Sequence, residues 1–234
     1  MIVTLKCLSA LLTYPSADLQ AATPEIAPLL RDEGLLSPEM QAALAPLLSE
    51  MENNDLFDLQ ERYVLLFDRS RSLSLNLFEH VHGESRERGG AMVDLLETYR
   101  AGGFEPSGPD LPDHLPMLLE FLSSRPVDEA RETLADAAHI MIALAERLDR
   151  RKSSYAPVLR AAASLASVPA AAELLAEIAA QPDDDPEDLA ALDAVWEEAM
   201  VTFGPDPNAG CPAGRDMLSR MPPPPKPAWP GQKP

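Results

Sequence analysis

The stretch DEARETLADAAHIMIALAERLDR, residues 128–150, repeats its apolar side chains with the period of an α-helix. Acidic and basic residues fill many of the positions between them. The residues that share one stripe are Leu134, Ala138, Met141, Ala145 and Leu148. Because such a stripe leaves water only when other elements pack against it, the stretch predicts a long helix in the core.

Residues 53–67 repeat their apolar side chains with the same helical period. Asn54 is placed to cap a helix there, and acidic residues fill its first turn. One face of this helix, within NNDLFDLQERYVLLF at residues 53–67, carries Leu56, Leu59, Tyr63 and Leu66.

Helices are also predicted after the central stretch. Ser153 or Ser154 can cap one over about 155–167, and another follows Val168-Pro169 as far as about residue 180. Asp185-Pro186 opens a further helix, with proline at the first helical position.

Evidence for strands is confined to SLSLNLF, residues 72–78, which alternates with period two. A single strand has no partner, and Leu73 and Leu77 also fit one helical face, so a helix over 72–81 is the better interpretation. The fold class is therefore all-α. We expect a single globular helical-bundle domain of about nine to eleven helices over residues 1–203.

The composition changes after Phe203. Residues 204–234 contain ten prolines, four of them consecutive at 222–225. A segment of this kind buries too little apolar surface to fold, so it is expected to form a disordered or polyproline-like tail.

The charge of the chain excludes some classes of partner. Its formal net charge of −19 repels nucleic acid and anionic lipid, and it attracts a basic segment of another protein. Between Arg160 and Arg215 there are eleven acidic residues and no lysine or arginine. This region is either a solvated acidic helical face or a landing surface for a basic peptide.

The cysteines and the apolar runs indicate a cytoplasmic protein. Cys7 and Cys211 are far apart and form no CxxC motif, which disfavours a disulfide framework or a cysteine zinc site. No apolar run approaches the roughly 18 residues of a membrane span, and the run from Cys7 to Leu12 is too short for a signal peptide. We therefore expect no membrane insertion.

The most polar short segment is HVHGESRERGGAM, residues 80–92. Its His-x-His pair, arginines and glycines raise three possibilities: a metal site, a phosphate loop and an acid/base pair. The two histidines diverge on a helix, and although carboxylates could complete a metal site, nothing in the spacing demands one. The segment also lacks the Lys-Ser/Thr ending of a P-loop, and no nucleophile motif appears elsewhere in the chain. Gly83 instead suits a helix end and Ser85 a helix cap, which predicts an elbow between two helices.

Two features of this elbow are not explained by folding alone. Arg86 and Arg88 lie in a first helical turn, where positive charge is disfavoured. Gly89-Gly90 costs about 1 kcal/mol per glycine inside a helix. Either tight intramolecular packing or contact with a ligand or peptide would account for them. The second helix has an apolar stripe and ends at Gly102-Gly103; the stripe consists of Met92, Leu95, Leu96 and Tyr99.

A second polar cluster opens DLPDHLPMLLEFL, residues 110–122. Asp113 is a suitable N-cap, with Pro116 at the third helical position and His114 in the first turn. His114 is either an ordinary exposed residue beside a cap or part of a binding site. The side chains that face the core are predicted to be Leu115, Leu118, Leu119 and Leu122.

Four segments together resemble the NarJ-type delta-chain chaperones of respiratory nitrate reductase, within the TorD/DmsD-like group of molybdoenzyme chaperones. They are LLTYPSADL (11–19), HVHGESRERGGAMVDLL (80–96), LPDHLPMLLEFL (111–122) and WEEAMVTFG (196–204). The resemblance covers residues 1–204 in the same order as in the family, and it leaves the tail without a counterpart.

The resemblance implies an all-helical cytoplasmic chaperone. Such proteins bind the apo catalytic alpha chain of nitrate reductase, chiefly through its N-terminal peptide, and keep it competent for molybdenum cofactor insertion. Pro112, Asp113 and His114 match the family's Pro-Asp-His signature. The wider group often has Glu-Pro ahead of Asp-His, where this chain has Asp110-Leu111-Pro112, which is closer to the nitrate reductase branch. The residues that match the signature of the nitrate reductase branch are His80, His82, Gly83, Glu84, Ser85, Arg86 and Arg88.

We therefore expect a peptide-binding chaperone, with no catalytic residues and with neither a metal nor a cofactor of its own. Two alternatives stay open. A metal-dependent helical phosphohydrolase would use His80, His82 and His114 with carboxylates. A protein that binds the molybdenum cofactor directly would place Arg86 and Arg88 on its pyrophosphate.

Overall fold

The structure is a computed structural model that describes residues 1–81, 86–106 and 108–180. The described residues form ten α-helices and no strand, which confirms the all-α prediction. The helices are α1 (Val3–Leu11), α2 (Ala17–Glu33), α3 (Pro38–Asn53), α4 (Leu56–Tyr63), α5 (Leu77–Val81), α6 (Arg86–Ala101), α7 (Leu115–Ser123), α8 (Val127–Arg150), α9 (Ala156–Ser164) and α10 (Ala172–Ala179). The helix expected after Asp185 and the tail from residue 204 lie outside the described residues.

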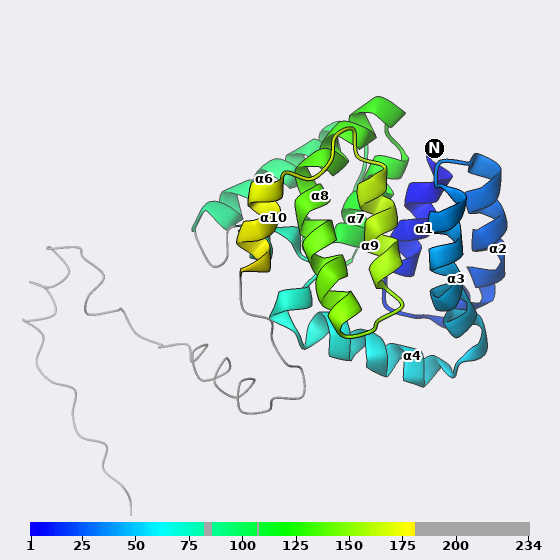
Figure 1. The fold of residues 1–234 in the computed structure, drawn as a ribbon. Coiled ribbons are helices and arrows are strands. Elements are labelled where there is room, and N and C mark those ends of the chain that lie inside the picture. The colour runs from blue at the N-terminus through cyan, green and yellow to red at the C-terminus, as the bar shows by residue number, and fades with distance from the viewer. Residues whose placement is uncertain (82–85, 107, 181–234) are drawn as a thin grey trace, which may run out of the picture. The chain divides into compact units, whose positions relative to one another are not determined.

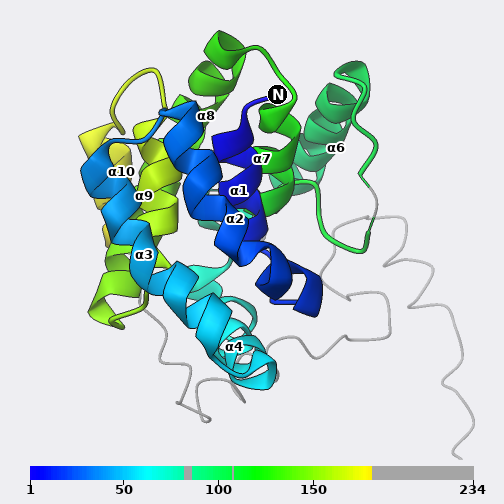
Figure 2. The same cartoon turned by 90° about the vertical axis from the view of Figure 1, so that its right-hand side faces the viewer.

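The helices pack mainly in pairs. α8 lies along α9, α1 along α7 and α2 along α3, and α1 also contacts α2. Figure 1 shows α2 and α3 at one end of this arrangement and α10 at the other, against α8. Figure 2 shows α1 in the middle, with α2 on one side and α7 on the other. α1 is consequently a central helix, and most of its residues are buried.

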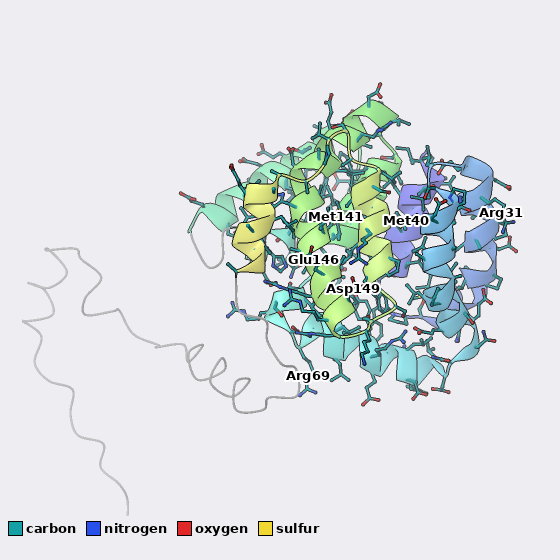
Figure 3. All side chains as sticks on the ribbon, viewed as in Figure 1. Arg31, Met40, Arg69, Met141, Glu146 and Asp149 are labelled. Atoms are coloured by element: carbon teal, nitrogen blue, oxygen red, sulfur yellow. The ribbon has the colours of Figure 1, made fainter. Side chains whose placement is uncertain are left out.

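The predicted stripe of α8 faces the core. None of its five residues, Leu134, Ala138, Met141, Ala145 and Leu148, is more than 1% exposed. Met141 is buried, whereas Glu146 and Asp149 on the same helix are exposed (Figure 3). Periodicity therefore located the central helix correctly, to within one residue at its start.

Two predicted helix caps are wrong. α3 extends to Asn53 and makes Asn54 its last cap, so α4 is capped by Asp55, whose Oδ1 accepts from Phe57 N at 2.8 Å. α9 begins later than expected, at Ala156. Its N-cap is Tyr155 and has no side-chain cap, although Ser153 Oγ accepts from Tyr155 N at 3.3 Å. In both cases the neighbouring element fixes the boundary, and a local pattern does not reveal it.

The helix predicted over 72–81 is only partly correct. A 3-10 turn covers Arg71–Leu73, and Asn76 then forms an isolated antiparallel bridge with His114 before α5 begins. The extended stretch does have a partner after all: Leu115 N donates to Leu75 O at 2.8 Å. This pairing involves residues some 40 positions apart, which explains why the single segment gave no sign of it.

Neither glycine of the pair that follows α6 can easily be replaced by another residue. A Cβ added to Gly102 would lie 2.6 Å from Cε2 of Phe121, and Gly103 has a φ of +76°. α6 ends at Ala101, as the sequence predicts. Gly102 is therefore required for the contact of α6 with α7, and Gly103 for the turn that follows.

Replacing Gly102 by alanine is expected to lower the free energy of unfolding by about 1–2 kcal/mol, because the buried Phe121 ring must shift. The matched control is Gly90→Ala in the same helix, where an added Cβ meets nothing within 4 Å. That change should raise the free energy of unfolding by up to about 1 kcal/mol through helix propensity. Urea unfolding of both variants measures the difference, and equal effects would contradict the packing argument.

Candidate functional site

Asp113 joins the two polar segments that the sequence singled out. It is 0% exposed, its Oδ2 accepts from Phe78 N at 3.0 Å, and its main-chain oxygen accepts from Leu77 N at 3.0 Å. Asp113 therefore caps α5, which carries His80, and does not cap α7 as predicted. The N-cap of α7 is His114, without a side-chain cap, because the bridge to Asn76 turns Asp113 toward α5.

The same loop also fixes α6. Pro112 O accepts from Tyr99 OH at 2.7 Å, and Arg88 Nη2 in α6 lies 3.1 Å from Glu79 Oε1 in α5. We refer to Glu79, Arg88, Pro112 and Asp113 as the signature joint. Burial raises the pKa of Asp113, while the hydrogen bond from Phe78 and the charge of Arg88 oppose that rise. The joint connects α5, α6 and α7 at one buried carboxylate.

The remaining signature residues have different environments. His80 is 6% exposed, and its Nε2 lies 2.8 Å from Ser74 O, so it is part of the core. Arg86 is the first residue of α6. His82, Gly83, Glu84 and Ser85 lie outside the described residues, so their predicted elbow and cap stay predictions.

Acidification is expected to destabilise the fold through His80. Burial lowers its pKa from the ordinary 6.5 and outweighs the hydrogen bond with Ser74, which raises it; Arg147 lowers the pKa further, and Glu79 and Asp113 raise it. Because the unfolded chain binds the proton first, stability is lost as the pH falls below about 6.5 toward the pKa of the folded state. Urea unfolding across this pH range should show that the free energy of unfolding of His80→Gln depends less on pH than that of the unmodified chain. An unchanged slope would contradict the assignment.

The glycine pair at Gly89 and Gly90 is not tightly packed within the described part of the chain. Both glycines are exposed, and an added Cβ would meet nothing within 4 Å at either. Intramolecular packing, one of the two predicted explanations, is thus wrong for the residues described. The charge of Arg88 in the first turn of α6 is accounted for by its pairing with Glu79. Contact of the glycine pair with a partner stays a prediction.

A groove of about 600 Å³ opens beside the signature joint. It lies between α7, the end of α4, the α1–α2 connection and the loop before α7. His114 lines it, which places the third residue of the Pro-Asp-His signature in a cavity. The apolar lining consists of Tyr14, Tyr63, Phe104, Pro106, Pro116 and Met117. The acidic lining consists of Asp68, Glu105, Asp110 and Glu120.

The charged side chains that line the groove are mostly acidic. None of the described residues that line it is a lysine or an arginine, and only Glu120 has a cation beside it, Lys6. Burial lowers the pKa of His114, with Asp110, Asp113 and Asp68 opposing that effect. His114 is therefore mostly neutral near pH 7, and the groove combines several carboxylates with aromatic side chains in its lining.

Most of this groove was not predicted. Tyr14 and Met117 lie within two of the segments that carry the family resemblance, which was the available signal for them. Asp68 and Phe104 had none, because they lie in a turn and a loop with no periodic pattern.

The described residues lack two features that other classes of protein would require. Among residues 1–81, 86–106 and 108–180, no group of three or more histidine, cysteine, aspartate or glutamate side chains is arranged to hold a metal ion. Within the same described residues, no helix has both the length and the apolar character that crossing a membrane requires.

Comparison with known proteins decides the family. The model of the family described as nitrate reductase delta subunit matches residues 33–161, which include α7 and the signature joint. The chain belongs to this family. It is 42% identical over 210 residues to the nitrate reductase molybdenum cofactor assembly chaperone NarJ of Escherichia coli K12, covering 89% of this chain and 88% of that protein.

Two other relatives extend the comparison. A probable chaperone of the same description, NarW of Escherichia coli K12, is 36% identical over 212 residues, or 88% of this chain and 86% of NarW. A probable NarJ of Bacillus subtilis is 31% identical over 157 residues, or 67% of this chain and 84% of that protein. These matches confirm the resemblance to NarJ-type nitrate reductase assembly chaperones that the sequence segments indicated.

Proposed function

We propose that this chain is a cytoplasmic chaperone that binds the apo catalytic alpha chain of a nitrate reductase through the N-terminal segment of that chain. In this role it supports insertion of the molybdenum cofactor and assembly of the enzyme complex. This proposal is supported by the names of the relatives described above, which are nitrate reductase molybdenum cofactor assembly chaperones, two of them named as probable ones. The chaperone acts by binding and release, without a catalytic step.

The observation that carries this proposal is the composition of the groove. Tyr14, Phe104 and Met117 provide apolar contacts, as is typical of a groove that holds the apolar face of an amphipathic helix. Asp68 and Asp110 provide negative charge at the same opening. Such charge favours a basic segment and accelerates its encounter with the protein.

The two alternative functions receive less support. A carboxylate-rich groove repels the pyrophosphate of a nucleotide-containing cofactor. Arg88, one of the two arginines expected to bind it, donates to Glu79. No described cluster suggests the metal centre of a phosphohydrolase.

The test is a calorimetric titration of the full chain with a synthetic peptide that copies the N-terminus of the nitrate reductase alpha chain from the same organism. Met117→Lys should weaken binding roughly tenfold or more, because it removes apolar contact and adds a charge that repels a basic peptide. The matched control is Met40→Lys, since Met40 is also half-buried but lies on α3 and does not line the groove. Absence of binding by the unmodified chain at low salt would refute the proposal.

A further inference from the structure

A second cavity of about 250 Å³ adjoins the groove. The two share Tyr63, Asp68, Asp110 and His114, so they form connected compartments. We call the smaller compartment the side pocket. The other residues that line it are Phe67, Ser74, Leu75, Asn76, Pro109 and Leu111.

The end of α4 directs Asp68 toward these compartments. After Tyr63 the helix continues as a π-helical turn over Val64–Asp68, in which Arg69 N donates to Val64 O at 3.0 Å. In an α-helix, two residues five positions apart point to different sides, since each residue advances by about 100°. The wider π turn instead lets Tyr63 and Asp68 line the same two cavities.

The side pocket has negative charge that the described protein does not neutralise. Asp68 and Asp110 form no ion pair within the described residues, and no described lysine or arginine lines the side pocket. Burial raises the pKa of Asp68, and Asp110 raises it further, against the effect of His114. His114 is the only basic side chain among the described lining residues, and burial holds its pKa below the usual value.

The side pocket suits the charged end of a long side chain, because most of its accessible surface is polar. The methylene stem of that side chain would lie along the apolar lining of the adjoining groove, to which Tyr14 and Met117 contribute. Asp68 and Asp110 offer two carboxylates to the charged end. A guanidinium presents several donors in a planar fork, whereas an ammonium group is a compact point charge, so arginine offers more hydrogen bonds to carboxylates than lysine does.

We propose that the side pocket receives one arginine or lysine side chain of the bound segment, while the larger groove receives its apolar residues. This inference rests on the proposed function and specifies the chemistry of the client. Because the compartments share four lining residues, the cation and the nearest apolar anchor lie within about one helical turn of the client. The client is thus selected by a cation and an apolar residue at that spacing.

The protein side of the test uses Asp68→Asn and Asp110→Asn in the full chain, titrated with the alpha-chain peptide. Each should weaken binding roughly tenfold to a hundredfold, the range for loss of a charge-assisted hydrogen bond, and should reduce its dependence on salt. The control is Asp58→Asn, an exposed aspartate of α4 that lines neither compartment. Its affinity should stay within about twofold of the unmodified chain. Thermal unfolding checks that all three variants fold.

In the second arm of the test, each lysine and arginine of the alpha-chain peptide is replaced singly by glutamine. One replacement should cause a loss similar to that of Asp68→Asn, and combining the two should add little, as expected for interacting partners. Fully additive losses at every position, or Asp68→Asn and Asp110→Asn variants that bind like Asp58→Asn, would overturn the side-pocket inference and leave the proposed function intact. Failure of the unmodified chain to bind the peptide would overturn both.

Discussion

Replacing Arg147 by alanine is expected to lower the free energy of unfolding by roughly 3–5 kcal/mol. Arg147 is only 1% exposed although it carries a full charge. Its Nη1 donates to Ser72 O at 2.6 Å, and its Nη2 donates to Ile178 O at 2.7 Å. The side chain therefore connects α8 both to the 3-10 turn before α5 and to α10.

The size of the effect follows from what the substitution leaves behind. Two buried carbonyl oxygens lose charged donors, each hydrogen bond of this kind contributing about 1.5–3 kcal/mol, and a cavity replaces the long side chain. Arg147→Lys should recover only part of the loss, because an ammonium group cannot span both carbonyls with the geometry of a guanidinium.

Urea unfolding measured by circular dichroism tests this expectation. The control is Arg100→Ala in α6, where the side chain is exposed and a change within about 0.5 kcal/mol is expected. A loss below about 1 kcal/mol for Arg147→Ala would mean that the buried cation contributes little beyond its own cost of desolvation.

Arg147 also shows where sequence reasoning ends. Apolar periodicity identified α8 and its buried face, because leucine, alanine and methionine recur at positions that only a helix aligns. Arg147 lies close to Arg150 and Arg151 in a charged run, and no local pattern distinguishes the buried arginine from its neighbours. The tertiary contacts with residues 72 and 178, which lie far away in the sequence, distinguish Arg147 from these neighbours.

The sequence predicted only part of the candidate site, as it did for α8 and Arg147. The family signature pointed to Asp113 and His114, and the structure places one in a buried joint and the other in a groove. The groove itself also needs Tyr14, Asp68 and Phe104, which come from three separate parts of the chain. The two glycine pairs look alike in the sequence, yet only Gly102 approaches another side chain closely. In each of these cases, the role of a residue depends on which residues from distant parts of the chain lie next to it in space.

The other large effect is expected at the signature joint. Asp113→Ala should lower the free energy of unfolding by about 2–3 kcal/mol, because Phe78 N loses a charged acceptor and Arg88 loses its nearby carboxylate. Asp113→Asn keeps an oxygen that can accept from Phe78 N. Its loss should be about 1 kcal/mol, mainly from placing a new amide donor in a buried site.

The pH dependence distinguishes the charge of Asp113 from its shape. Burial raises its folded pKa above the ordinary 3.8, so ionisation is easier in the unfolded chain. The folded state therefore loses stability as the pH rises from about 4 through that pKa, whereas Asp113→Asn has no such loss. The stability of the Asn variant relative to the unmodified chain should consequently improve as the pH rises. A constant difference between the two chains would show that the carboxyl does not titrate in this range.

The joint should also affect client binding, because the main chain of His114 pairs with Asn76 directly beside the cap that Asp113 makes. Asp113→Ala is expected to weaken binding of the alpha-chain peptide several-fold at temperatures where the variant is folded, and Asp113→Asn much less. Leu44→Ala provides the comparison, since Leu44 is fully buried in α3 away from the groove and its truncation costs about 2–5 kcal/mol. If Leu44→Ala reduces affinity as much as Asp113→Ala, the effect arises from lost stability alone. A reduction confined to Asp113→Ala means that the signature carboxylate positions the groove.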